Sequence, residues 1–210
     1  RLAELGYRSI KVKVGRREDP RVDAAVLLAV REAVGSGVAL RADANRAWSL
    51  EQAVAFGQAA AGAGIEYVEE PCAAPSDIPM FFVSTGLRAG LDETVDEHAA
   101  ALRQGAESPV FPQLLSFPAI AAVVIKPSVV GGIEATEALA AEAAAAGKAV
   151  VLSSAFESSV GLAVIASMAA AHEACAAATE PTSHGLATAG WLAQDVVAAP
   201  LTPTTQPAPG

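Results

Sequence analysis

Short β-rich runs alternate with longer alanine-rich runs along most of the chain, and this alternation constrains the fold more than any other feature. Seven runs predict strands, the last with the weakest pattern: Ser9–Val14, Val38–Ala42, Ile65–Glu69, Arg88–Leu91, Ala121–Ile125, Ala149–Leu152 and Thr182–Gly185. The runs between them predict helices: Arg21–Val34, Leu50–Ala63, Ser76–Ser84, Glu97–Gln104, Glu134–Ala146 and Gly161–Ala171. Strands that alternate with helices imply a parallel sheet with right-handed crossovers.

The spacing of this unit favours a closed barrel over an open sheet. The strand–helix unit recurs about every 30 residues, which is typical of a (β/α)8 barrel of about 250 residues. An open doubly wound sheet is the alternative, but no Gly-x-Gly-x-x-Gly sequence follows the first predicted strand. Five predicted strands end in charged residues, and barrels build their active sites at that end of the strands. The proline-containing segment Glu107–Phe117 is predicted to hold no helix.

Charge and composition exclude two classes of partner. The net charge is -9, and no cluster of Lys and Arg is present of the kind that nucleic-acid phosphates require. No apolar run is long enough and free enough of polar residues to span a membrane. Cys72 and Cys175 lack metal-binding or redox spacing, which indicates a reducing compartment.

The two ends of the chain predict different structures. Residues 1–7 predict the last turn of a helix that stops at Gly6, and the first residue is Arg1 rather than Met. We therefore expect this sequence to be part of a longer polypeptide. Residues 1–196 are expected to form one incomplete barrel domain, and residues 197–210, rich in Pro and Thr, a flexible tail or linker.

Three carboxylates stand at the ends of successive predicted strands. Asp43, Glu69 and Asp92 are expected to converge, because the carboxyl ends of barrel strands meet at one mouth. In the pairs Glu69-Glu70 and Asp92-Glu93 adjacent residues face opposite ways, and we take the first of each. Three carboxylates without His or Cys suit a hard cation such as Mg2+, with Mn2+ as a second candidate.

Two lysines are expected on either side of this metal site. Lys11 and Lys13 share one face of the first predicted strand, and Lys126 follows the fifth. A single strand-end carboxylate is most often a helix cap or a solvated loop residue, and a single Lys is most often a surface charge. An ordered set of acids and bases on five successive strands favours an active site instead, with Lys13 and Lys126 facing each other across the mouth.

The order of these motifs resembles a known family. Lys-x-Lys, Asp-x-Asn, Glu-Glu-Pro, Asp-Glu and Lys-Pro on successive strands resemble the muconate-lactonizing branch of the enolase superfamily. Residues 10–14, 41–46, 124–128 and 156–159 resemble the o-succinylbenzoate synthase family more closely. Residues 129–132 and 184–186 resemble the synthase portion of the fused phylloquinone-biosynthesis protein of plants and algae. The resemblance extends from about residue 5 to residue 196.

The resemblance implies a fold and a reaction. The fold is a TIM-type (β/α)7β barrel, here without its first strand and without the N-terminal α+β capping domain, so the chain alone is expected to be inactive. The reaction is a Mg2+-dependent syn-dehydration of 2-succinyl-6-hydroxy-2,4-cyclohexadiene-1-carboxylate in menaquinone or phylloquinone biosynthesis. The implied partners are this small carboxylate substrate and other domains of a longer polypeptide. The implied location is a plastid in a plant or alga and the cytoplasm otherwise, and the chain itself shows no targeting signal.

The resemblance also implies a role for each matching residue. Lys13 is the general base, Lys126 stabilises the enediolate, and Asp43, Glu69 and Asp92 hold the metal. The residues that assist Lys13 or bind the substrate are Lys11, Arg41, Asn45 and Ser154.

Three other functions stay open. N-acylamino-acid racemases, dipeptide epimerases and cycloisomerases would use the same lysines and metal. A Schiff-base aldolase would use Lys126 as nucleophile, but it gives the three carboxylates no purpose. A non-catalytic segment or scaffold of a fused protein is the third alternative.

Overall fold

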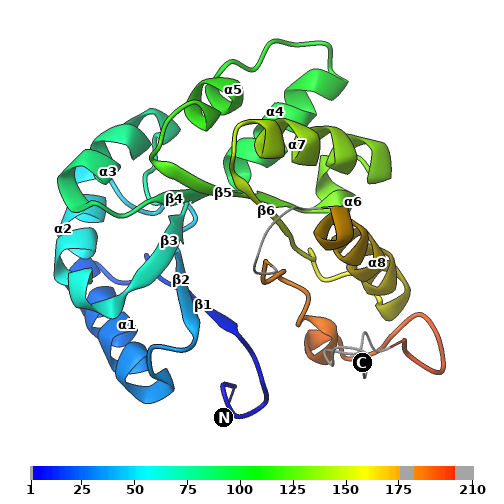
Figure 1. Cartoon of the computed structure of the whole chain (residues 1–210), viewed down its shortest axis with the longest axis horizontal. Helices are drawn as coiled ribbons and strands as arrows, with labels where there is room; N and C mark the ends of the chain where they lie inside the picture. The colour runs from blue at the N-terminus through cyan, green and yellow to red at the C-terminus, as the bar shows by residue number, and fades with distance from the viewer. Residues whose placement is uncertain (1, 176–181, 202–210) are drawn as a thin grey trace.

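A curled parallel sheet with helices along its outer side organises the computed structural model, which describes residues 2–175 and 182–201 (Figure 1). Its six strands lie side by side in sequence order, and every neighbouring pair is parallel. The strands are β1 Ser9–Lys13, β2 Ala39–Asp43, β3 Ile65–Glu69, β4 Ala89–Leu91, β5 Ile120–Ile125 and β6 Ala149–Leu152. The barrel-type architecture predicted from the sequence is confirmed for these strands.

The seventh predicted strand, Thr182–Gly185, is reduced to one bridge. Gly185 pairs with Ser153 at the end of β6, through Ser154 N–H to Gly185 O at 3.0 Å and Gly185 N–H to Leu152 O at 2.9 Å. Upstream of this bridge, the Leu152 N–H donates to the His184 side chain at Nδ1 (3.0 Å) rather than to a backbone carbonyl. A side chain therefore takes the place that a longer strand's backbone would occupy.

The helices follow the predicted order, with two additions. Those of the described residues are α1 Pro20–Val34, α2 Leu50–Ala59, α3 Ile78–Thr85, α4 Glu93–Arg103, α5 Val110–Leu115, α6 Pro127–Val130, α7 Ile133–Ala145 and α8 Ser159–Cys175, with 3-10 turns η1 Ala61–Ala63, η2 Pro75–Asp77 and η3 Ala189–Trp191. Each of four predicted helices is followed by a glycine with positive φ, the conformation that ends helices at glycine: Gly35, Gly64, Gly86 and Gly147.

Helix α5 corrects the prediction that residues 107–117 hold no helix. Pro109 lies just before the helix and Pro112 lies in its first turn, where backbone N–H groups have no partner within the helix. The prolines therefore remove no helical hydrogen bond. Phe111 packs against His98 with ring centroids 4.8 Å apart, which anchors the short helix to α4.

Two layers of apolar side chains hold the sheet. The outer layer, between strands and helices, contains fully buried Leu27, Phe56, Phe81 and Phe111. A smaller inner cluster on the concave side consists of Tyr67, Ala122, Val124 and Val151. The inner layer is small because polar residues occupy the concave side near the strand ends.

The described sheet is open on one side. Strand β1 pairs with β2 alone among the described residues, and a cavity of about 940 Å³ lies between β1 and the segment 182–191. Near the start of the chain, Gly6 N–H donates to Ala3 O (3.0 Å) and Tyr7 N–H to Leu2 O (3.3 Å), with Gly6 at φ 85°. These are the bonds that end a helix, as predicted for this segment.

Two further predictions concern the chain's environment and its end. Within residues 2–175 and 182–201, no helix combines the length and apolar character that a membrane crossing requires. Of the predicted tail 197–210, residues 202–210 lie outside the described residues, as does Arg1.

Candidate metal centre and lysine pair

Five charged residues of the candidate site lie at the carboxyl ends of successive strands. Lys13, Asp43 and Glu69 are the last residues of β1, β2 and β3. Asp92 directly follows β4, and Lys126 directly follows β5. Because all strands are parallel and adjacent in sequence order, these five ends line one rim of the curled sheet.

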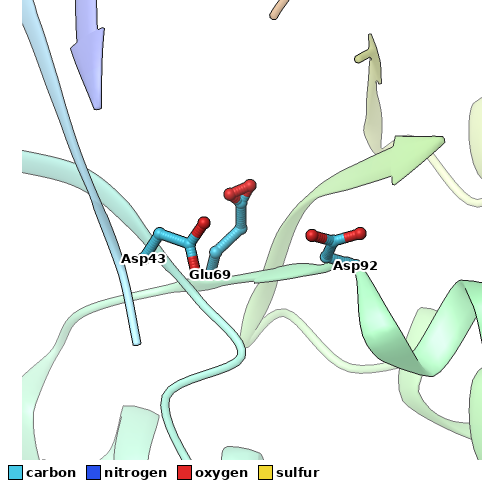
Figure 2. A group of neighbouring side chains, drawn as sticks. All are labelled: Asp43, Glu69 and Asp92. Atoms are coloured by element: carbon cyan, nitrogen blue, oxygen red, sulfur yellow. The ribbon is translucent and has the colours of Figure 1, made fainter. Parts of the chain in front are cut away.

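Asp43, Glu69 and Asp92 direct their carboxylates into one common space (Figure 2). One oxygen of each lies within 4.8 Å of the others, and the three residues are only 1%, 1% and 3% exposed. In the part of the chain that the structure describes, this is the single group of three such side chains arranged to hold a metal ion. An all-oxygen donor set with this spacing fits a hard divalent cation, whose ligand bonds are about 2.1 Å for Mg2+.

Strand register and one glycine set this convergence. Lys13 is opposite Asp43 in the β1–β2 pair, and Asp43 is opposite Glu69 in the β2–β3 pair. Glu69 is in turn opposite Gly90 of β4. A Cβ at residue 90 would lie 2.8 Å from ring atoms of Tyr67 and 3.3 Å from Glu69 Cγ. Gly90 therefore leaves the space that the Glu69 side chain needs to reach the group.

Three lysines surround the carboxylates. Lys11 Nζ donates to both oxygens of Glu69, at 2.8 and 2.7 Å, and lies 3.1 Å from Asp43 Oδ2. Lys13 Nζ donates to Asp43 Oδ2 at 2.6 Å, whereas Lys126 Nζ bonds to Asp92 and lies 3.4 Å from Asp96 Oδ2. Lys13 and Lys126 thus contact different members of the group, from strands separated by β2, β3 and β4.

Burial and the neighbouring charges shift the pKa values in opposite directions. Burial lowers the pKa of Lys11, but Glu69 and Asp43 outweigh it and raise that pKa to about 12. Burial raises the pKa of Glu69, Lys11 offsets part of the rise, and the charge of Asp43 adds to it. Burial also raises the pKa of Asp92 against the effect of Lys126. Burial raises the pKa of Asp43 too, but Lys11 and Lys13 outweigh it and lower that pKa. Glu69 and Asp92 therefore resist ionisation, and a bound divalent cation would relieve that cost.

The pKa of Lys126 is also raised. Burial lowers it, but the charges of Asp92, Asp96 and Glu93 outweigh the loss of solvent. Lys126 is therefore held as a cation at neutral pH. Chemically, the rim offers a cation-binding oxygen group with an ammonium ion beside it.

Two of the predicted assisting residues, Asn45 and Ser154, differ in their distance from the site. Asn45 lies beside Lys13: its Oδ1 accepts from Lys13 Nζ at 2.7 Å, and its Nδ2 donates to Glu93 Oε1 at 2.7 Å. Ser154 lies after β6 and shares a 2.6 Å hydrogen bond with the Thr188 hydroxyl. No hydrogen bond or ion pair joins the Ser154 side chain to the carboxylate group among the described residues, so its predicted role stays a prediction.

Arg41 faces the cavity rather than the carboxylate group. Its Nε donates to Glu66 Oε2 and its Nη1 to Ser183 O, both at 2.7 Å, and the guanidinium lies 4.9 Å from the centre of the Tyr67 ring. Arg41, Lys11, Tyr67 and Glu69 all line the cavity of about 940 Å³. The cavity therefore adjoins the carboxylate group from below the rim.

Sequence reasoning missed two residues at the site. Tyr67 precedes Glu69 by two positions in β3, so strand alternation could have placed both on the inner face. Asp96 lies four residues after Asp92 in the chain, and helical spacing puts it one turn above Asp92 and near Lys126. Neither position belongs to a motif that marks it in the sequence.

The family model described as enolase C-terminal domain-like matches residues 1–206. The chain belongs to this family. Its enolase-superfamily relatives include Protein PHYLLO, chloroplastic, of Arabidopsis thaliana, which is 40% identical over 207 residues. That match covers 94% of this chain and 12% of the Arabidopsis protein.

Bacterial members of the enolase superfamily are similar as well. The o-succinylbenzoate synthase of Vibrio cholerae serotype O1 (strain M66-2) is 35% identical over 167 residues, covering 78% of this chain and 47% of that enzyme. The substrate-liganded complex of the L-Ala-D/L-Glu epimerase from Bacillus subtilis matches with a TM-score of 0.72 and 28% identity, covering 92% of this chain and 50% of the epimerase. The chain thus spans about half the length of these bacterial relatives.

Proposed function

We propose that this chain carries the metal and lysine half of an o-succinylbenzoate synthase. The reaction is the Mg2+-dependent loss of water from 2-succinyl-6-hydroxy-2,4-cyclohexadiene-1-carboxylate, which makes the enzyme a carbon–oxygen lyase. The observation that carries the proposal is the 35% identity to the Vibrio cholerae enzyme of that name. It is joined by the placement of the acids and lysines at five successive strand ends. The 40% identity to the Arabidopsis protein supports the same substrate class.

Lys13 is proposed as the general base. Its Nζ takes the proton from the ring carbon next to the carboxylate, and the resulting ammonium returns that proton to the departing hydroxyl on the same face. Water leaves and the ring becomes aromatic, so protons balance without a second acid. Bonds from Lys13 Nζ to Asp43 (2.6 Å) and Asn45 (2.7 Å) support this role, because they place the amine at the rim beside the proposed metal ligands.

Lys126 is proposed to stabilise the enediolate intermediate as a permanent cation. Its raised pKa supports this role, since an ammonium that stays charged can balance a developing negative charge throughout the reaction. Asp43, Glu69 and Asp92 are proposed to hold Mg2+, with Mn2+ as a substitute. The metal would supply further positive charge next to the substrate carboxylate. Lys11 is proposed to assist by keeping Glu69 and Asp43 oriented, and Arg41 by binding the substrate from the cavity.

A dipeptide epimerase is the second candidate. The structural similarity to the Bacillus subtilis epimerase, at 28% identity, supports it. Lys13 and Lys126 would then act on opposite faces of one carbon, one removing a proton and the other returning it. The two candidates differ in the fate of the substrate, because only the synthase expels water and forms an aromatic ring.

The test is a pair of assays on the longest natural polypeptide that contains this chain. The first follows the ultraviolet absorbance of the aromatic product from the cyclohexadiene substrate, with Mg2+ and with a chelator. The second follows deuterium uptake from D2O into a panel of dipeptides and N-acylamino acids. We expect Mg2+-dependent aromatisation in the first assay. Deuterium uptake without aromatisation would favour the epimerase, and activity in neither assay would favour a non-catalytic segment.

The longer polypeptide and its location are part of the proposal. The match to 12% of the Arabidopsis protein supports a chain that works together with other domains, as a fused protein would. The chloroplast named for that relative supports a plastid location if this chain comes from a plant or alga.

A further inference from the structure

Glu70 follows the candidate ligand Glu69 but takes no part in the three-carboxylate group. Its side chain is fully buried, and its backbone has φ 39°, in the left-handed region that residues other than glycine rarely adopt. Arg46, in the loop after β2, has φ 58°. Such strained conformations persist only where surrounding contacts hold them, and they cluster at functional sites.

The carboxylate of Glu70 binds the first backbone N–H groups of helix α4. Its Oε1 accepts from Asp92 N–H at 3.0 Å and from Thr94 N–H at 2.8 Å. Asp92 stands at the N-cap of α4, where an aspartate normally accepts an N–H from two or three residues further on. The described structure shows no such bond from the Asp92 side chain. Glu70 therefore caps α4 in place of Asp92, and the Asp92 carboxylate is free to face Glu69 and Lys126.

Arg46 holds Glu70 in this position. Its Nε donates to Glu70 Oε2 at 3.0 Å, and its backbone N–H donates to Glu70 O at 2.9 Å. Its Nη2 donates to the Thr94 hydroxyl at 3.0 Å. A buried carboxylate requires a positive partner, and Arg46 provides it while joining the ends of β2, β3 and α4.

We propose that Glu70 and Arg46 are a positioning pair that keeps Asp92 turned toward the metal site. This inference rests on the proposed metal role of Asp43, Glu69 and Asp92. Without the Glu70 carboxylate, the N–H groups of Asp92 and Thr94 lose their acceptor, and the side chain of Asp92 at the N-cap turns to accept from the Thr94 N–H. The metal site then loses one of its three ligands, although no ligand has been replaced.

The test measures Mg2+ binding by calorimetry in wild type, Glu70→Ala and Glu70→Gln. The Ala variant should raise the Mg2+ dissociation constant by about 10–100-fold, the range for residues that orient metal ligands. The Gln variant keeps an oxygen acceptor for the N–H groups of Asp92 and Thr94 but loses the charge opposite Arg46. It should therefore show a smaller increase, so the three proteins form a graded series.

Two controls separate positioning from loss of stability. Leu27→Ala removes a fully buried side chain of α1 and should lower the melting temperature without changing Mg2+ affinity. Arg46 Nη1 also lies 2.5 Å from Oε1 of Glu97, its second and more exposed acidic partner. Glu97→Gln removes that charge and should leave Mg2+ affinity within about twofold, because Glu70 still caps α4.

The outcomes distinguish this inference from the function on which it rests. Wild-type Mg2+ affinity retained in folded Glu70→Ala would overturn the positioning role alone. If that variant does not fold, unchanged affinity in Glu70→Gln would overturn it as well. A wild-type protein that binds no Mg2+ would overturn both the metal site and the positioning pair.

Discussion

Lys13 Nζ lies 2.6 Å from Asp43 Oδ2, and the two residues are directly opposite each other at the ends of neighbouring strands. The pair is unequal in exposure, because the Asp43 side chain is 1% exposed and the Lys13 side chain is 45% exposed. The carboxylate is therefore fixed in the rim, while the amine can turn toward a molecule that enters from the mouth. This arrangement suits a fixed metal ligand beside a mobile base.

Loss of one carboxylate should weaken metal binding. Asp43→Asn removes a charge from the proposed ligand group while preserving the shape of the side chain, so the Mg2+ dissociation constant should rise at least tenfold. Calorimetric titration with Mg2+ measures this change. Glu51→Gln, which removes an exposed carboxylate in the first turn of α2, is the matched control and should bind Mg2+ like wild type.

The space at Gly90 should tolerate no side chain. Gly90→Ala would place a Cβ 2.8 Å from the Tyr67 ring and 3.3 Å from Glu69 Cγ, and such overpacking typically costs about 1–3 kcal/mol of stability. Mg2+ affinity should fall together with the melting temperature, because Glu69 is displaced. Gly37→Ala meets no atom within 4 Å and should change neither quantity. Equal melting curves for both variants would contradict the close packing at residue 90.

The two cysteines should differ in reactivity. Cys72 is fully buried, and burial raises the pKa of its thiol to about 12, with the charges of Asp77 and Glu70 adding to the rise. Cys175 is exposed. At pH 8 a disulfide reagent should therefore modify one thiol per folded chain and two after unfolding in guanidinium. Two rapidly reacting thiols in the folded protein would show that Cys72 is accessible.

The open side of β1 should promote self-association of the 210-residue chain. Arg8 O and Val14 N–H bond to β2, so by alternation the N–H of Ser9 faces away from β2. Ser9→Pro removes an edge donor without removing a bond of the sheet, and it should shift the chain toward monomer in light scattering. Val12→Pro is the contrasting variant and should unfold the protein, because its N–H faces β2. A wild-type chain that stays monomeric at high concentration would contradict this expectation.

Much of the fold follows from periodicity alone. The six strands β1 to β6 begin and end within one or two residues of their predicted bounds, because each is a short β-rich run between longer alanine-rich runs. The predicted seventh strand is longer than the single bridge that forms at Gly185. His184 accepts from the Leu152 N–H through its side chain, and a longer strand would have used that N–H for its backbone. Sequence periodicity does not report such a side-chain contact. Helix α5 was missed because prolines in a first turn and prolines in a helix interior look alike in sequence.

The candidate site, like the fold, could be predicted only in part from the sequence. Strand-end position predicted that Asp43, Glu69 and Asp92 would meet, and they do. Alternation alone could not reveal that Glu70 caps α4, because this contact joins two elements 22 residues apart. Nor could it show that Arg41 bonds to Ser183, 142 residues away. Contacts of this range depend on how the sheet curls, and no local pattern encodes them.

The most direct test of the account is the turnover of Lys13→Ala in the longest natural polypeptide that carries this chain. Removal of a general base should lower the rate of Mg2+-dependent aromatisation by about 10²–10⁴-fold, while Mg2+ still binds because Asp43, Glu69 and Asp92 are intact. Lys148→Ala removes a lysine that bonds to Phe117 O, away from the site, and should keep wild-type turnover. Near-normal turnover in Lys13→Ala would contradict the central claim that this lysine moves the proton.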